Sequence, residues 1–127
     1  MIEKLTRILY VEDEPDIQVV ARLALESVGG YTVEICSSGP DALVRAPAFQ
    51  PQLILLDVMM PAMNGPTTLI KLRELAGFAT TPVVFMTAKV QPDELAAYLR
   101  LGAKDVIPKP FDPMKLASQV QAIWERA

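Results

Sequence analysis

Residues 52–61, QLILLDVMMP, set a single carboxylate, that of Asp57, between two apolar runs. A lone charge in an apolar interior costs several kcal/mol, or its pKa shifts until the group is neutral. The apolar run at 53–56 does not alternate with polar residues, which is typical of a parallel strand covered on both faces. The stretch therefore predicts a central strand whose carboxyl end carries an acidic group.

Four further apolar, often β-branched runs read as strands, and stretches with helical spacing lie between them. The five expected strands span residues 7–11, 31–36, 53–56, 82–86 and 105–107. Prolines mark the expected helix starts, because the first helical position needs no N–H: Pro15, Pro40, Pro66, Pro92 and Pro113. Strands that alternate with helices demand parallel crossovers. The sequence thus predicts an α/β fold with a doubly wound, five-stranded parallel sheet.

Length and composition bound the function. A chain of 127 residues, 51% hydrophobic and 21% charged, is expected to form one domain over residues 1–127. A net charge of −3 gives no basic stripe, so direct nucleic-acid binding is not expected. No apolar run approaches the ~20 residues of a membrane span, and acidic residues at positions 3 and 12–14 interrupt any signal-peptide core. We expect a cytoplasmic protein without membrane contact.

The sequence contains no histidine and one cysteine. The first fact excludes Ser-His and Cys-His catalysis and imidazole metal sites. The second excludes an intrachain disulfide and a thiolate metal cluster, and we expect Cys36 to be a small buried strand residue. The chemistry left to the chain uses carboxylates, hydroxyls, lysines and a hard metal ion.

Polar residues follow four of the expected strands. In an open parallel sheet, ligands bind beyond the carboxyl ends of the strands, where the strand order reverses. The residues at these ends are Glu12 and Asp13 after the first strand, Asp57 at the third, Thr87 after the fourth and Lys109 past the fifth. Three carboxylates, a hydroxyl and an ammonium are therefore expected to converge on one rim.

Each of these residues also has a simpler interpretation. Asp13 could cap the first helix, Asp57 could be a turn residue, Thr87 could start the next helix, and Lys109 could be a solvated surface charge. Together they favour a site, because clustered carboxylates repel one another unless a cation binds. Oxygen ligands without Cys or His favour Mg²⁺ over Zn²⁺. Lys109 is suited to pair with an anionic group on Asp57, and phosphate is the natural candidate.

The chain resembles the receiver domains of two-component response regulators, of the chemotaxis-regulator type. The motifs run over the whole length, as ILYVEDEPD, LILLDVMMPAMNG, VVFMTA and GAKDVIPKPF. The resemblance implies a flavodoxin-like fold with strand order 2-1-3-4-5 and a cis peptide between Lys109 and Pro110. It implies that Asp57 is the phosphoacceptor, that Thr87 and Lys109 contact the phosphoryl oxygens, and that four groups hold Mg²⁺. These are the carboxylates of Glu12, Asp13 and Asp57 and the backbone carbonyl of Met59.

The roles implied by the resemblance form a consistent mechanism of phosphoryl transfer, in which the Ala88 backbone N–H can also donate to the phosphoryl group. Without a histidine in the chain, the donor is external, and by resemblance it is a phosphohistidine of a sensor kinase or of a phosphotransfer protein. The phosphoryl group then shifts a surface formed by residues 92–100, 104–107 and 113–126, which a downstream protein binds. Such a protein is a switch that catalyses its own phosphorylation and slow dephosphorylation, not a turnover enzyme. We expect a monomer or a weak, phosphorylation-dependent dimer.

Two positions depart from the family pattern, and two more lie where the family varies. Val106 stands where the family commonly has an aromatic switch residue, so we hypothesise that the signal runs through the backbone from Thr87 to Lys89 and the fourth helix. Pro108 cannot donate to a sheet ladder, so the fifth strand is expected to be an edge. Met59 and Lys89 flank the site, and the apolar Met59 offers no hydrogen bond to a hydrolytic water.

Two other functions fit parts of the pattern. One is an aspartate-dependent phosphatase of the haloacid dehalogenase type, which needs a second acid two residues after the nucleophile, where this chain has Met59. The other is a degenerate receiver that acts as a constitutive interaction module without phosphorylation. On the last helix, Trp124 could belong to a partner-binding patch, but the spacing of Leu116, Val120 and Ile123 favours core packing.

Overall fold

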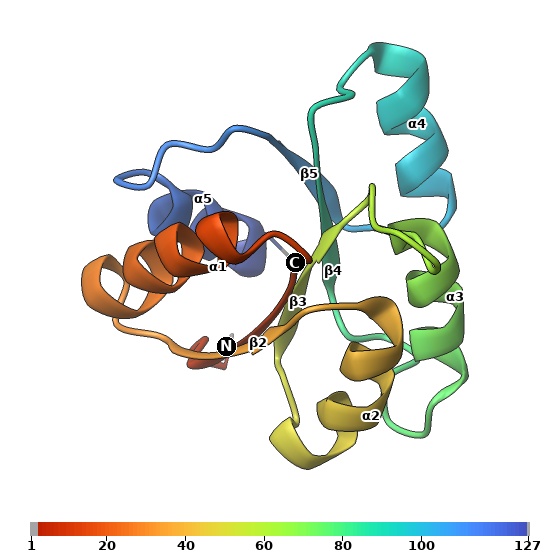
Figure 1. Cartoon of the computed structure of the whole chain (residues 1–127), viewed down its shortest axis with the longest axis horizontal. Helices are drawn as coiled ribbons and strands as arrows, with labels where there is room; N and C mark the ends of the chain where they lie inside the picture. The colour runs from red at the N-terminus through yellow and green to blue at the C-terminus, as the bar shows by residue number, and fades with distance from the viewer. Residues whose placement is uncertain (1–2, 127) are drawn as a thin grey trace.

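The computed structural model describes residues 3–126, which form five strands and the helices that connect them (Figure 1). In chain order the elements are β1 (Arg7–Val11), α1 (Pro15–Arg22), η1 (Leu23–Val28, a π-helical stretch), β2 (Thr32–Cys36), α2 (Gly39–Phe49), β3 (Leu53–Asp57), α3 (Gly65–Glu74), β4 (Val83–Thr87), α4 (Pro92–Arg100), β5 (Asp105–Pro108) and α5 (Leu116–Glu125). Every adjacent pair of strands is parallel, and the order is β2-β1-β3-β4-β5. The predicted fold and strand order are confirmed.

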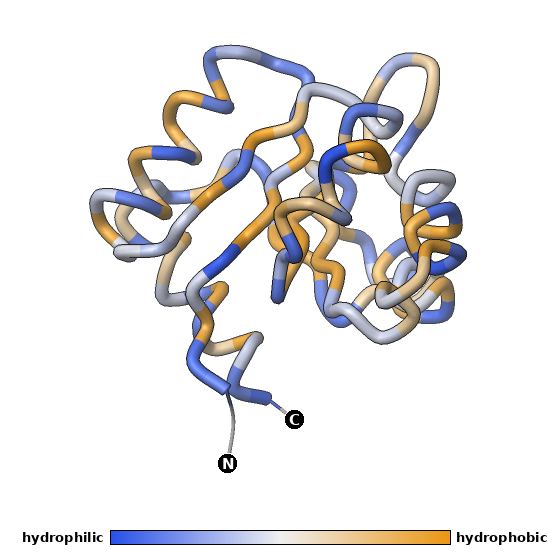
Figure 2. The backbone as a smooth tube through the Cα atoms, turned by 90° about the horizontal axis from the view of Figure 1, so that it is seen from below, coloured by the Kyte–Doolittle hydropathy of each residue, from blue (hydrophilic) through white to orange (hydrophobic). Residues whose placement is uncertain are grey.

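The sheet separates two apolar layers. Helices α1 and α5 cover one face, where Tyr10, Leu55 and Met86 belong to the core, and α2, α3 and α4 cover the other face (Figure 1). Every residue of β3 and of β4 is buried, as their unbroken apolar runs predict. The helices have mixed hydropathy: in Figure 2, hydrophilic and hydrophobic residues alternate along each helical turn. The ends of these buried strands therefore define the positions of the residues that follow them.

Several local predictions are confirmed. The edge position of β5 agrees with the proline at its last residue, and the Lys109–Pro110 peptide is cis. Cys36 is buried on β2. Trp124, on α5, is half-buried and packs against the core. Its indole N–H donates to the Glu3 carbonyl oxygen at 2.7 Å. The interpretation of Trp124 as a packing residue therefore holds.

One predicted helix start is wrong. The last helix begins at Leu116 and not at Pro113, because the Asp112 carboxylate accepts the Met114 N–H at 2.9 Å and holds residues 113–115 in a turn. The first helical segment is not a regular α-helix throughout, since α1 is followed directly by the π-helical stretch η1. The end of η1 meets α5 closely: a Cβ at Gly29 would lie 2.8 Å from the Cβ of Ala117, so only glycine fits there.

The boundaries of the remaining elements differ from the predictions by one residue at most places, as at β2, which begins at Thr32, and β4, which ends at Thr87. Helices α1 and α4 begin at Pro15 and Pro92, and α2 and α3 begin one residue before Pro40 and Pro66. Within residues 3–126, no helix is both long enough and apolar enough to span a membrane.

Candidate functional site

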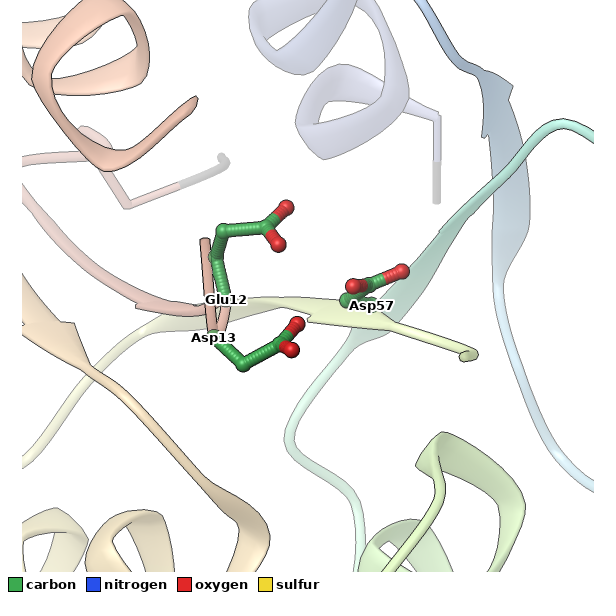
Figure 3. A group of neighbouring side chains, drawn as sticks. All are labelled: Glu12, Asp13 and Asp57. Carbon is green, nitrogen blue, oxygen red and sulfur yellow. The ribbon is translucent and has the colours of Figure 1, made fainter. Parts of the chain in front are cut away.

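Three carboxylates converge beyond the carboxyl ends of β1 and β3, which are neighbours in the sheet (Figure 3). Glu12 and Asp13 follow β1, Asp57 ends β3, and one oxygen from each lies within 4.8 Å of the others. Glu12 is 0% exposed and Asp57 is 3% exposed. Two buried carboxylates this close repel each other strongly, so the cluster requires positive charge.

Lys109 supplies part of that charge. Its ammonium nitrogen lies 3.0 Å from Oε1 of Glu12 and 3.4 Å from Oδ1 of Asp57, and its side chain is only 17% exposed. Burial alone would lower the pKa of Lys109, but its hydrogen bond with Glu12 and the charge of Asp57 raise it overall. Its backbone N–H donates to the Thr87 carbonyl oxygen at 2.9 Å, which fixes the lysine relative to β4.

The ionised form of Glu12 is disfavoured in this arrangement. The pKa of its carboxyl is raised to about 7, because burial and the charge of Asp57 raise it more than the hydrogen bonds from Lys109 and from the Glu14 N–H lower it. The Glu14 N–H donates to Oε2 of Glu12 at 3.2 Å. A single ammonium therefore does not compensate the cluster, and an additional cation bound by the three carboxylates would relieve the repulsion. All donors are oxygens, which suits Mg²⁺.

A small pocket of about 140 Å³ lies beside Asp57. It is lined by Glu14, Asp57, Met59, Thr87, Ala88 and Lys109. Thr87 is buried at the end of β4, and its hydroxyl oxygen accepts the Lys89 backbone N–H at 3.0 Å. The Met59 side chain is 63% exposed at the mouth. An anionic group on Asp57 would meet a hydroxyl and an ammonium in this pocket.

The loop after β3 presses closely on Asp57. The Gly65 N–H donates to the Val58 carbonyl oxygen at 2.9 Å, and a Cβ at Gly65 would lie 2.6 Å from the Asp57 carbonyl oxygen. Only glycine fits at this position. In the same loop Ala62 has a φ of +68°, a left-handed conformation that costs an alanine energy. The loop that carries Met59 is thus held by close backbone contact.

The geometry rejects the simpler interpretations of single residues. Asp13 is not the first helix's cap, because α1 is preceded by Glu14 without a side-chain cap. Thr87 does not begin α4, whose start at Pro92 follows a capping box of Gln91 and Glu94. Lys109 is not a free surface charge, since it pairs with two buried carboxylates. Asp57 is the buried last residue of a strand.

Sequence reasoning missed two supporting residues. Glu14 lines the pocket and supports Glu12 through its backbone N–H, and the Gln18 side-chain amide donates to the Glu12 carbonyl oxygen at 2.6 Å. Gln18 lies on α1, one helical turn after the cap residue Glu14. Residues four apart share one face of a helix, so the predicted helix start at Pro15 could have placed Gln18 near the loop after β1. Glu12 is thus contacted by Glu14, the residue before α1, and by Gln18 on α1.

The family model of the response regulator receiver domain matches residues 8–121. The chain belongs to this family. It is 36% identical over 121 residues to the alkaline phosphatase synthesis transcriptional regulatory protein PhoP of Bacillus subtilis, and 34% identical over 120 residues to the DNA-binding response regulator MtrA of Mycolicibacterium smegmatis. These alignments cover 95% and 94% of the chain but 49% and 51% of the relatives, so the chain spans about half the length of the curated relatives it matches.

Among solved structures, this receiver is similar to the chemotaxis protein CheY4 of Vibrio cholerae. The TM-score is 0.87 at 28% sequence identity, and the match covers 94% of this chain and 99% of that one. Receiver domains are signalling switches and not turnover enzymes, and in general they bind Mg²⁺ and interact with histidine kinases and downstream targets. The interpretation as a haloacid dehalogenase-type phosphatase is therefore wrong.

Proposed function

We propose that Asp57 is the phosphoacceptor of a two-component phosphorelay and that the chain forms one receiver domain over residues 1–127. The observation that carries the proposal is the Asp57 carboxylate itself. It is buried, it faces a small pocket, and it lies 3.4 Å from the Lys109 ammonium and within 4.8 Å of two further carboxylates. A purely structural aspartate would not need three charged neighbours.

The reaction transfers a phosphoryl group from a phosphohistidine of a sensor kinase or phosphotransfer protein. A carboxylate oxygen of Asp57 attacks phosphorus, the P–O bond forms, the P–N bond to the histidine breaks, and the electron pair returns to the imidazole. Such a transfer needs an in-line nucleophile and preorganised positive charge more than covalent chemistry from the protein. The Lys109 ammonium lies beside Asp57 and lines the same pocket. It can therefore pair with the phosphoryl oxygens once they are on Asp57.

Glu12, Asp13, Asp57 and the backbone carbonyl of Met59 would hold Mg²⁺. The fit is supported by three carboxylate oxygens that lie within 4.8 Å of one another and by the pKa of the Glu12 carboxyl, which burial and the charge of Asp57 raise. When bound, the ion supplies positive charge to the transferring group. The pairing of β1 with β3 keeps the three carboxylates close together.

Three groups would bind the phosphoryl oxygens once they are on Asp57: the Thr87 hydroxyl, the Ala88 backbone N–H and the Lys109 ammonium. Thr87 and Ala88 line the pocket together with Lys109. The threonine hydroxyl can donate to the phosphoryl group while its oxygen still accepts the Lys89 N–H. These contacts stabilise the aspartyl phosphate, which the chain hydrolyses slowly.

The phosphoryl group adds roughly −1.5 to −2 charges and strong acceptors beside the loop after β4. We propose that the loop and α4 respond and that the surface of α4, β5 and α5 then binds a downstream protein. On this surface, Val106 is half-buried on β5 and has no ring to move, which supports a signal through the backbone of Thr87 and Lys89. In this proposal the receiver is a monomer or a weak, phosphorylation-dependent dimer. It does not bind nucleic acid directly.

The deciding experiment is intact mass spectrometry after incubation with Mg²⁺ and acetyl phosphate. We expect one phosphoryl adduct that requires Mg²⁺ and is lost in Asp57→Asn. Asp93→Asn, which removes an exposed carboxylate on α4, is the matched control and should keep the adduct. A folded wild type that binds Mg²⁺ without forming an adduct from this donor or from a phosphohistidine donor would favour the degenerate interaction module instead.

A further inference from the structure

The outer edge of the sheet at β2 is covered by side chains from both helical layers. The ladder to β1 uses alternate residues of β2, since the Thr32 N–H donates to Thr6 and the Cys36 carbonyl accepts from Glu12. The backbone groups of Val33 and Ile35 therefore point away from the sheet. At an edge strand these groups form a template for pairing with another strand.

Two arginines reach this edge from opposite faces. Arg45, on α2, donates from Nη1 to the Ile35 carbonyl oxygen at 2.7 Å. Arg22, on α1, lies with Nη1 3.5 Å from the Val33 carbonyl oxygen. Figure 1 shows β2 between these two helices at the end of the sheet. The two outward carbonyls of β2 are thus both covered by guanidinium groups, and the Arg45 contact is the shorter one.

Arg45 is itself anchored. Its guanidinium pairs with the Glu34 carboxylate on β2 and, at 3.2 Å, with the Asp41 carboxylate one turn earlier on α2. Asp41 also covers the edge, because its Oδ2 accepts the Ser37 N–H at 3.2 Å. Several ion pairs with one arginine hold the side chain in a single geometry far better than an isolated surface pair does. The edge is therefore closed by an arginine that two carboxylates hold and not by an unpaired side chain.

We propose that Arg45, anchored by Glu34 and Asp41, closes the β2 edge against pairing with the β2 strand of a second copy of this chain. The strand TVEIC is β-branched and half-buried, which suits it to such a contact once its carbonyls are free. A second copy is the natural occupant, because it presents the same strand with the same free edge and pairing across a twofold axis is self-complementary. The closure is independent of the phosphoacceptor chemistry proposed above.

The test is the self-association of Arg45→Met, measured by sedimentation velocity of the unphosphorylated chain over a concentration series. This variant keeps the aliphatic stem and removes the guanidinium. We expect self-association about tenfold tighter than that of the wild type, which corresponds to a gain of one or two intermolecular backbone hydrogen bonds. A folded Arg45→Met with wild-type self-association overturns the proposal.

Two controls separate edge pairing from general loss of stability. Arg73→Met removes a guanidinium that also binds backbone carbonyls, those of Phe78 and Thr81 at 3.0 and 2.6 Å, but away from the β2 edge. It should self-associate as the wild type does, and equal association in both variants overturns the proposal. Ile35→Pro, added to Arg45→Met, removes an outward N–H and should reverse the tightening. Persistent association of this double variant also overturns it.

If Arg45→Met does not fold, Asp41→Ser provides the second measurement. It uncovers the Ser37 N–H and removes one anchor of Arg45 while the arginine remains. We expect a smaller tightening of self-association in the same direction. A folded Asp41→Ser that sediments as the wild type at every concentration would then overturn the proposal.

Discussion

The backbone N–H of Lys89 donates a 3.0 Å hydrogen bond to the hydroxyl oxygen of Thr87. This contact joins the last residue of β4 to the loop that leads into α4, whose own residues are all at least partly exposed. Because no residue of α4 is fully buried, we infer that its position is sensitive to the loop before it. A change at the Thr87 hydroxyl therefore has a direct route to the helix without a ring at Val106.

Thr87→Val tests this route. The substitution keeps the shape and removes the hydroxyl, so Lys89 loses its acceptor and a phosphoryl group on Asp57 no longer acts on the loop. We expect Mg²⁺ with beryllium fluoride, a phosphoryl mimic, to shift amide resonances of Lys89 and α4 in the wild type but not at α4 in Thr87→Val. Thr87→Ser, which retains the hydroxyl, should restore them. Wild-type shifts confined to the phosphate-site loops would contradict a backbone route.

The sequence predicted the parts of this molecule that depend on local patterns. Burial on both faces makes β3 and β4 continuous apolar runs, and four of the five helices start at or beside a proline. The site followed from the same logic, because parallel strands bring their carboxyl ends to one rim and so place Asp57 near Glu12 and Lys109.

Long-range contacts were beyond such patterns. At the end of η1, the close approach to α5 leaves no room for a side chain at Gly29, because a Cβ there would lie 2.8 Å from the Cβ of Ala117. The Lys109 ammonium lies 3.0 Å from Glu12 and 3.4 Å from Asp57, and these three residues stand at the ends of three different strands. These features arise from residues far apart in the chain, and hydrophobic periodicity carries no signal for them.

Met59→Asn should shorten the life of the aspartyl phosphate several-fold. Met59 lies at the mouth of the pocket with 63% exposure and cannot hydrogen-bond a water, whereas an amide can orient one toward phosphorus. The measurement is the decay of the phosphoryl adduct by intact mass after removal of the donor. Met114→Asn changes another exposed methionine, at 72% exposure, outside the pocket, and should leave the decay unchanged. An unchanged or longer lifetime in Met59→Asn would refute the role.

Ala62→Gly should stabilise the fold by about 0.5–1 kcal/mol. Alanine at a φ of +68° pays the cost of the left-handed region, which glycine does not. The matched reverse change is Gly77→Ala, where φ is +88° and an added Cβ meets nothing within 4 Å, so only the backbone cost is added. Urea unfolding should show opposite shifts of similar size. A loss of stability in Ala62→Gly would mean that the alanine methyl group makes a contact that outweighs the strain.

Tyr10→Phe should stabilise the fold by about 1 kcal/mol. The Tyr10 side chain is fully buried and its hydroxyl has no hydrogen-bond partner among residues 3–126. The desolvation of the hydroxyl is therefore not offset by a hydrogen bond in the fold. Tyr31→Phe is the contrasting control, because the Tyr31 hydroxyl donates to Oε1 of Gln121 at 2.6 Å and its removal should cost stability. If both variants lost stability in urea unfolding, the Tyr10 hydroxyl would have a bonding partner in solution.

Stability should fall above pH 9 in part because of Cys36. Burial raises the pKa of this thiol from 9.0 to about 12, so the folded chain keeps the proton that the unfolded chain loses. The unfolded state therefore binds fewer protons, and the free energy of unfolding decreases as the pH rises from 9 toward 12, with no contribution from this group below pH 9. Cys36→Ala should show a shallower decline in urea unfolding over this range. Equal slopes in the two proteins would show that the thiol ionises as readily in the fold as in the unfolded chain.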